Sequence, residues 1–214
     1  RCATSLSSHE VAQGYKDVKD RTVYAKFAVE NANNTYFLAW TTTPWTLPSN
    51  VALCMNANED YSKIKVGEEY YILANALISS LFKPEEYALV DTKKGKEYEY
   101  TKYDPLFDFV YNKHKNEAWF VTCDDYVTLT DGTGIVHIAP AFGEDDSKVG
   151  KKYKLPFVQL VDESGKLTAE CGAFAGIFVK DADAHIIRNL KENGKLLKEK
   201  QHEHSYPFCW RCNT

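Results

Sequence analysis

Two short stretches carry the side chains whose types and spacing could do chemistry. The first, residues 40–50 (Trp-Thr-Thr-Thr-Pro-Trp-Thr-Leu-Pro-Ser-Asn), places four threonines and an asparagine around two tryptophans. Its two prolines exclude a regular helix or a central strand, so the hydroxyl and amide groups lie on a rigid loop. Large aromatic side chains beside such a loop often form pocket walls. A threonine-rich loop on its own more often satisfies only its own backbone.

The second stretch is residues 132–146 (Gly-Thr-Gly-Ile-Val-His-Ile-Ala-Pro-Ala-Phe-Gly-Glu-Asp-Asp). Its β-branched run over 135–138 predicts a buried strand, and the three acidic residues at its end are typical of a helix start. His137 would then lie in the strand and Asp146 just inside the helix. A strand–turn–helix corner can direct both side chains into one pocket. A packed core histidine and a purely structural helix-start carboxylate are the competing interpretations.

Composition limits the classes of function. The chain has 214 residues, 44% of them hydrophobic, and a net charge of −4, which argues against broad electrostatic binding of nucleic acid but leaves a local basic patch open. We find no apolar run long enough to span a membrane and no signal peptide. Six cysteines, including Cys209-Trp210-Arg211-Cys212, fit thiols and a metal-type pair in a reducing compartment. We therefore expect a cytoplasmic protein with no membrane partner.

Hydrophobic periodicity predicts many short strands with helices at the margins, and therefore an α+β fold with a β-barrel-like core and peripheral α-helices. We expect one domain over residues 1–214, excised from a larger chain, with 1–20 and 200–214 as junctions and 3–20 mostly loop. The expected strands are 22–30 and 35–41 (a hairpin), 51–55, 64–66, 70–73, 87–90, 97–103, 118–123, 126–129, 135–138 and 157–161, with an extended segment at 172–179. The expected helices are 74–82, the segment from 146 to about 153, and 181–193.

Together, the two stretches resemble the editing (connective polypeptide) domain of isoleucyl-tRNA synthetase, a class I enzyme, and the resemblance extends from Cys2 to Cys212. Valyl and leucyl relatives typically carry arginine after the paired threonines. Here the sequence reads Thr43-Pro44-Trp45, which favours the isoleucyl branch, with the valyl and leucyl editing domains as alternatives. Phe142 stands where many bacterial members have histidine.

The resemblance implies hydrolysis of valine mischarged on tRNA(Ile), with no cofactor and no ATP-dependent synthetic site. The implied catalytic residues are Thr42, Thr43 and Asp146; the implied substrate-binding residues are Trp40, Thr41, Thr46, Asn50 and His137. Asp146 would hold the substrate ammonium, and His137 would border the side-chain pocket, with Trp40 or Trp45 as the next candidates. The threonines would orient water and polarise the ester carbonyl, whereas Asn50 would fix either the loop or the terminal ribose. No activated nucleophile is evident, so we expect attack by a positioned water, alone or helped by the substrate's ribose hydroxyl.

The family also allows a structural zinc site in the full-length enzyme, to which Cys2, Cys209 and Cys212 would contribute three of four ligands. The expected partners are the acceptor end of tRNA(Ile) carrying valine and the remainder of the synthetase. Two other classes of function stay open. One is a non-catalytic tRNA-docking or linker module, and the other is a zinc-stabilised nucleic-acid module centred on residues 209–212.

Overall fold

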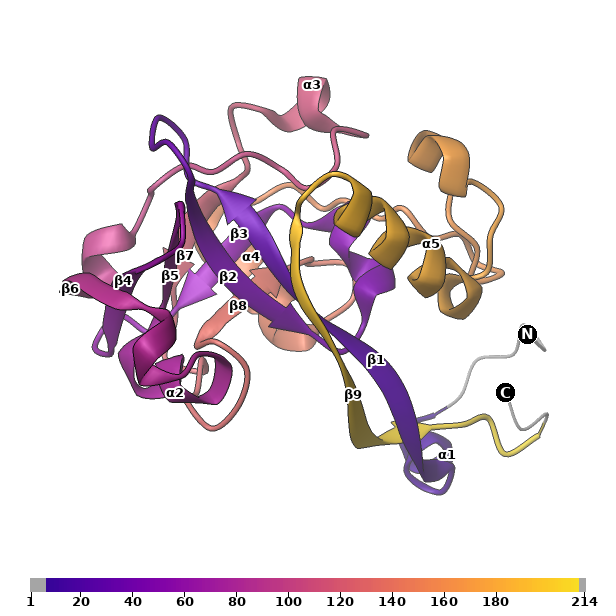
Figure 1. Cartoon of the computed structure of the whole chain (residues 1–214). Coiled ribbons are helices and arrows are strands. Elements are labelled where there is room, and N and C mark those ends of the chain that lie inside the picture. The colour runs from indigo at the N-terminus through magenta and orange to yellow at the C-terminus, as the bar shows by residue number, and fades with distance from the viewer. Residues whose placement is uncertain (1–6, 212–214) are drawn as a thin grey trace.

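Two β-sheets form the centre of the molecule, and helices lie around them (Figure 1). The computed structural model describes residues 7–211. The six-stranded sheet has the order β6 (Ala88–Lys94), β4 (Asp60–Val66), β5 (Glu69–Ala74), β2 (Thr35–Thr41), β1 (Tyr15–Ala28) and β9 (Leu196–Pro207). The three-stranded sheet has the order β7 (Phe120–Cys123), β3 (Ala52–Met55) and β8 (Ile135–Ile138). Neither sheet closes within the described residues, so the predicted α+β fold with peripheral helices is confirmed as two open sheets rather than a barrel.

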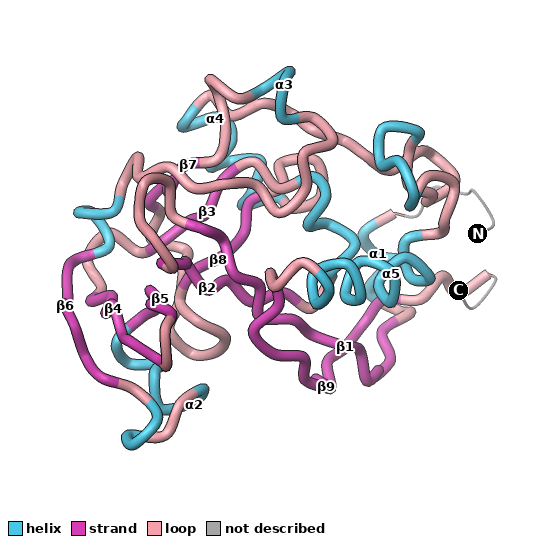
Figure 2. Tube along the Cα trace, turned by 45° about the horizontal axis from the view of Figure 1, so that its top comes forward, coloured by secondary structure: helices cyan, strands magenta, loops and turns pink. Residues whose placement is uncertain are grey.

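The helices are short and lie mainly in the connections between strands, as the tube in Figure 2 shows. The α-helices are α1 (Ser8–Ala12), α2 (Ile78–Leu81), α3 (Tyr111–His114), α4 (Glu144–Tyr153) and α5 (Val179–Glu192). Five 3-10 helices are η1 (Pro44–Ser49), η2 (Asn75–Leu77), η3 (Pro84–Glu86), η4 (Gly95–Tyr98) and η5 (Ala169–Phe174). The predicted helices from 146 to about 153 and at 181–193 are confirmed as α4 and α5, each of which begins two residues earlier than predicted. No helix of the described part is long and apolar enough to cross a bilayer.

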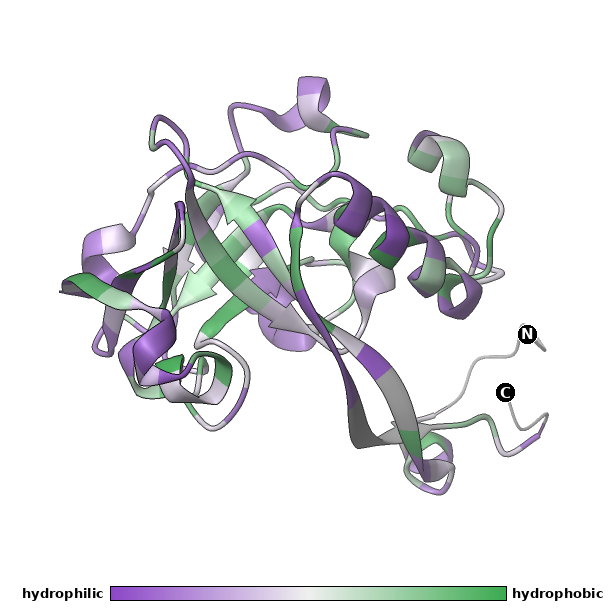
Figure 3. Cartoon of the chain, viewed as in Figure 1, coloured by the Kyte–Doolittle hydropathy of each residue, from purple (hydrophilic) through white to green (hydrophobic). Residues whose placement is uncertain are grey.

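The predicted hairpin is confirmed by the antiparallel pairing of β1 with β2. Val23, Ala25 and Phe27 are fully buried and alternate along β1, which is the period-two pattern of a strand with one face on the core. Hydrophobic residues gather along β2, β3 and β8 (Figure 3). Buried side chains of these strands belong to the main core, together with buried residues of β1 and α5. The sequence therefore carried a clear signal wherever a strand has a buried face.

A ribbon of β1 and β9 corrects the prediction at both ends of the chain. Residues 15–20 were expected to be loop, and no strand was expected beyond 193, yet β1 pairs antiparallel with β9 from Tyr15–Pro207 to Ala25–Leu196. The ribbon extends away from the body towards both ends of the described chain (Figure 1). Its sequences, Tyr-Lys-Asp-Val-Lys-Asp at 15–20 and Gln-His-Glu-His-Ser-Tyr-Pro at 201–207, are mostly polar, so hydrophobic periodicity could not reveal the pairing.

Four other predicted extended segments are wrong in detail. Residues 97–103 begin in η4, and Tyr100 has a positive φ of 66°, so they cannot form a continuous strand. Residues 126–129 are irregular, and 157–161 make only one bridge, from Val161 to Leu167. Of residues 172–179, the first three belong to η5 and the last begins α5, while a turn and a single bridge at Phe178 lie between them. The apolar residues of these segments are buried as predicted, including Val127, Val158 and Leu160. They do not form strands, because no neighbouring strand pairs with them.

The buried Tyr61 links β4 to the glycine-rich turn that precedes β8. Its hydroxyl donates to the Gly134 carbonyl at 2.6 Å and accepts from the Asn56 N–H at 2.9 Å. Gly134 has a φ of 71°, and a Cβ there would lie 2.5 Å from the Cβ of Ala74. Both the backbone conformation and the close approach therefore require glycine at this position.

We predict that Tyr61→Phe lowers the free energy of unfolding by about 1–3 kcal/mol, because it leaves the Gly134 carbonyl and the Asn56 N–H buried without a partner. Urea denaturation measures the effect. Tyr100→Phe is the matched control, since Tyr100 is 63% exposed and its ring contacts survive the change. Equal stability of the two variants would contradict the role of the Tyr61 hydroxyl.

Candidate functional site

The threonine loop leaves β2 at Thr41 and enters η1 at Pro44. Within it, the Thr43 N–H donates to Thr41 Oγ1 at 3.1 Å, and Thr46 Oγ1 donates to the Thr43 carbonyl at 2.8 Å. Thr43 Oγ1 lies 3.3 Å from Thr41 Oγ1 and 3.4 Å from Thr46 Oγ1. Thr42 is half-buried between them in the chain. The loop therefore satisfies its own backbone and also holds three hydroxyl groups in one short row.

A buried hydrogen bond joins this loop to β8. His137 Nε2 lies 3.0 Å from Thr46 Oγ1, and His137 is only 8% exposed. Burial lowers the pKa of His137 to about 4, so the ring is neutral at pH 7. Because the Thr46 hydroxyl already donates to Thr43, we assign the ring proton to Nε2, which donates to Thr46. Nδ1 is then an acceptor, buried and without a hydrogen-bond partner among residues 7–211.

Asp146 lies in the first turn of α4, where its carboxylate folds back over the helix start. The position that a Cβ would take on Gly143 is only 2.1 Å from Asp146 Oδ2, so this glycine makes room for the carboxylate. Burial, reinforced by the charge of Asp145, raises the pKa of Asp146 to about 7. A cation placed against this carboxylate would favour its ionised form, so the group suits a cationic ligand.

A second contact brings the loop to the turn before α4. The rings of Trp45 and Phe142 meet edge to face, with centroids 5.1 Å apart. The Trp45 N–H donates to Asp183 Oδ1 at 2.9 Å, which ties the same residue to α5. The loop is therefore held by β8, by the turn before α4 and by α5 at once. Neither Phe142 nor Asp183 was predicted as a site residue, and the local sequence around Asp183 gives no signal for that role.

Asn50 is buried, at 4% exposed, where the loop ends. Its amide nitrogen donates to the Ala52 carbonyl at 2.8 Å, and its amide oxygen accepts from the Tyr103 hydroxyl at 2.7 Å. Trp119 Nε1 donates to the Asn50 carbonyl at 3.0 Å. These internal bonds support the first of the two roles predicted for Asn50, fixing the loop.

Trp40 faces a different space from the threonines. It lines a cavity of about 330 Å³ together with the Asp131–Val136 turn and strand, and a Cβ on Gly132 would lie 2.8 Å from Trp40 Cε3. The lining of this cavity includes neither the loop threonines nor His137. Trp40 therefore lines this cavity, whereas Trp45, the neighbour of Thr46 in the chain, packs its ring against Phe142.

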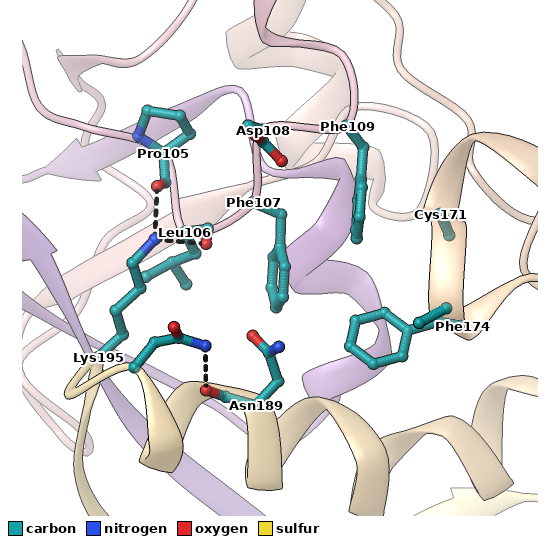
Figure 4. A pocket seen from close by; sticks show the side chains of 11 residues that line it. Pro105, Leu106, Phe107, Asp108, Phe109, Cys171, Phe174, Asn189 and Lys195 are labelled. Carbon is teal, nitrogen blue, oxygen red and sulfur yellow. Dashed lines mark hydrogen bonds between the residues drawn. The ribbon is translucent and has the colours of Figure 1, made fainter.

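A further cavity, of about 380 Å³, lies between α5 and the 105–109 segment (Figure 4). Phe107 and Phe109 stack on each other, and Phe174 meets both edge to face. Lys195 Nζ donates to the carbonyls of Pro105 at 3.2 Å and Leu106 at 2.7 Å. Burial lowers the pKa of Lys195. None of the predicted site residues lines this cavity.

The predicted zinc ligands fall mostly outside the described part of the chain. Cys2 and Cys212 lie outside residues 7–211, and Cys209 is buried. Among residues 7–211 no cluster of three or more histidine, cysteine, aspartate or glutamate side chains could hold a metal ion. The zinc site of the longer enzyme stays a prediction.

Comparison with known proteins places the chain in a family. No family model matches it. An isoleucine–tRNA ligase from Clostridium novyi is 53% identical over 214 residues, covering 100% of this chain and 20% of the relative. One from Picrophilus torridus is 49% identical over 215 residues, with the same coverage of both proteins. The chain belongs to the isoleucine–tRNA ligase family. It spans about a fifth of the length of the curated relatives it matches.

Solved structures show the fold. A structure described as GlLeuRS-CP1 superposes with a TM-score of 0.64 at 14% identity, covering 86% of this chain and 100% of that one. The editing domain of the P. knowlesi cytosolic leucyl-tRNA synthetase gives a TM-score of 0.60 at 11% identity, with coverages of 91% and 99%. The predicted connective-polypeptide editing-domain fold is confirmed. The sequence match is to isoleucine–tRNA ligases, as Thr43-Pro44-Trp45 indicated.

We predict that Asp146 makes stability depend on pH. Its pKa is about 7 in the folded chain against 3.8 for the unperturbed group, so the folded state retains a proton that the unfolded chain loses between these values. The contribution of Asp146 to stability therefore falls as pH rises from about 4 to 7. Asp146→Asn removes this pH-dependent contribution. The stability of the variant relative to the wild type should therefore increase as pH rises from about 4 to 7.

Urea denaturation at several pH values measures the difference, and the opposite dependence from His137 cancels because both proteins contain it. The carbon-13 carboxyl signal of Asp146 should titrate with a midpoint near 7. A stability difference that stays constant between pH 4 and 7 would contradict the prediction.

Proposed function

We propose that this chain hydrolyses the ester linkage of valine wrongly attached to tRNA(Ile). The observation that carries the proposal is the buried Thr46–His137 hydrogen bond of 3.0 Å, which joins the two stretches in one site. The Trp45–Phe142 contact then places the loop against the turn that leads to Asp146. Membership of the isoleucine–tRNA ligase family and the editing-domain fold support the same activity.

Such a site would compensate for the weak discrimination that a single apolar pocket achieves between side chains differing by one methylene. One methylene in an apolar pocket is worth only about 1–3 kcal/mol, and the discrimination of isoleucine from valine by isoleucyl-tRNA synthetases is the standard example of this limit. A second pocket that admits valine and rejects isoleucine supplies the missing selectivity. It must do so by shape, because isoleucine offers no additional polar group.

Asp146 would bind the α-ammonium of the esterified amino acid. The approach of a cation lowers the pKa of the carboxylate from about 7, so that binding itself ionises the group. The ion pair fixes the position of the ester relative to the loop. His137 is neutral at pH 7, so its proposed role is to border the space for the amino-acid side chain and limit its size rather than to transfer protons.

The threonines would position the attacking water and polarise the ester carbonyl. Thr43 Oγ1 lies in a row with Thr41 Oγ1 and Thr46 Oγ1, which restricts the directions in which these hydroxyls can point. Thr42 adds a fourth hydroxyl in the same loop. A single positioned donor to a developing oxyanion is worth about a hundred- to a thousandfold in rate. Positioned-water hydrolysis, alone or with the ribose hydroxyl of the substrate, then needs no protein nucleophile.

We predict that Asp146→Ala reduces deacylation of Val-tRNA(Ile) by at least about a hundredfold, because the ester is no longer held at the loop. Asp145→Ala is the matched control. The neighbouring carboxylate is exposed and pairs with Lys148, so its loss should leave the rate within about threefold of the wild type. Hydrolysis is measured as release of labelled valine. Near-normal hydrolysis by Asp146→Ala, with Asp145→Ala equally active, would contradict the assignment.

We predict that His137→Ala changes selectivity. Removing the ring opens space beside the bound side chain, so the variant should begin to deacylate correctly charged Ile-tRNA(Ile) while still acting on the valyl ester. Overpacking by one methylene costs about 1–3 kcal/mol, so the ratio of the two rates should move by about tenfold or more. The ratio is measured for both proteins on matched tRNA preparations, after thermal unfolding shows that the variant folds. An unchanged ratio would place the pocket wall elsewhere.

A further inference from the structure

A groove is lined by residues of helix α4, of the turn after it and by Pro140. It has a volume of about 250 Å³, and its lining includes Pro140, Ser147, Gly150, Lys151, Lys154 and Phe157; we call it the α4 groove. Its α4 residues recur at three- and four-residue spacing, so they form one stripe along the helix. Asp146 immediately precedes this stripe, and Pro140 belongs to the turn that carries Phe142. The groove therefore begins beside the candidate site and leads away from it.

The α4 groove carries positive charge that the protein leaves uncompensated. Of the lysines in this helix, Lys148 pairs with Glu144 at 3.0 Å and with Asp145 at 3.1 Å, and Lys152 pairs with Asp124 at 3.0 Å. Lys151 and Lys154, the two that line the groove, are exposed and pair with no carboxylate among residues 7–211. No acidic residue lines the groove. It is a local basic surface on a chain whose net charge is −4.

An exposed aromatic ring completes the groove. Phe157 is 65% exposed, which is unusual for so large an apolar side chain. The turn that presents it is well defined: the Leu155 N–H donates to the Gly150 carbonyl at 2.8 Å, and Lys154 caps α4 with a φ of 56°. Pro156 restricts the backbone immediately before Phe157. Most of the Phe157 side chain is therefore open to solvent, and it follows the C-terminal end of α4, whereas Asp146 lies in the first turn of that helix.

We propose that the α4 groove binds the unpaired 3′-terminal nucleotides of a tRNA acceptor end, with Lys151 and Lys154 on phosphates and one base stacked on Phe157. Lysines next to an exposed aromatic ring suit single-stranded nucleic acid, because the lysines can bind the phosphates while a base stacks on the ring. Asp146 and Lys154 are about 12 Å apart along the helix axis, from the rise per residue. Part of this inference rests on the proposed function, which supplies the aminoacyl ester at the Asp146 end.

Binding to an RNA hairpin tests the groove directly. The probe is a fluorescent acceptor-stem hairpin of tRNA(Ile) that carries the unpaired 3′ end, titrated with the full chain at several salt concentrations. Each phosphate contact on a single strand contributes about 0.7 to the slope of log affinity against log salt. The double variant Lys151→Gln/Lys154→Gln should therefore reduce the slope by about 1.4. Phe157→Ala should weaken binding about tenfold at fixed salt and leave the slope unchanged.

Controls separate the groove from general effects. Lys115→Gln and Leu89→Ala change an exposed lysine and an exposed apolar residue outside the groove and should bind as the wild type does. A blunt hairpin without unpaired nucleotides should bind the wild type and the groove variants equally. Unchanged slope and affinity in the groove variants, or the same loss on both hairpins, would overturn the proposal.

Two substrates distinguish this proposal from the proposed function. Groove variants should hydrolyse a valyl ester of adenosine alone at the wild-type rate but should show a raised KM for Val-tRNA(Ile). Equal loss on both esters would overturn the groove assignment. A wild-type chain that binds the hairpin through the groove but hydrolyses neither ester would contradict the proposed function and support the groove.

Discussion

The pairing register of β3 with β8 is the constraint on which the candidate site depends. Leu53 is opposite His137 in this antiparallel pair, and the Val51 N–H donates to the Ile138 carbonyl at 2.9 Å. A slip of one residue would turn the His137 ring to the other face of the sheet and break its bond to Thr46. Asn50 fixes the chain immediately before β3 through bonds to Tyr103 and Trp119. The geometry of the site is thus set by a small buried sheet rather than by the loop itself.

Burial affects the two titratable groups of the site in opposite directions on the pH scale. It lowers the pKa of His137 to about 4 and raises that of Asp146 to about 7, because in each case the charged form loses its hydration. Near neutral pH the site therefore holds an uncharged ring and a carboxylate that is protonated in part. In the proposed function, an arriving ammonium group would supply the countercharge for this carboxylate. The empty site then avoids a fully charged, desolvated carboxylate, and the occupied site would gain an ion pair.

The parts of the fold and site that the sequence predicts are those with a strong local signal. The hairpin of β1 and β2, strand β8 and helices α4 and α5 each follow from periodicity, a turn or acidic residues at a helix start. The outer part of the β1–β9 ribbon, residues 15–20 and 201–207, was not predicted because its sequence is mostly polar and its two strands come from opposite ends of the chain. Of the site, the Thr46–His137 neighbourhood was predicted from the two motifs. The contacts of Asp183 and Phe142 were not, because tertiary packing alone creates them.

The β1–β9 ribbon makes this a module that can be carried within another polypeptide. Tyr15 and Pro207 face each other across the ribbon, and paired strands lie about 5 Å apart. If a host chain enters along one strand and leaves along the other, its two attachment points are only a few ångströms apart. This separation does not depend on how many residues the inserted module contains. The hydrogen bonds of the ribbon offset the entropy of closing that long loop. Accommodating such an insertion requires only two neighbouring attachment points on the surface of the host, so its own core can stay as it was.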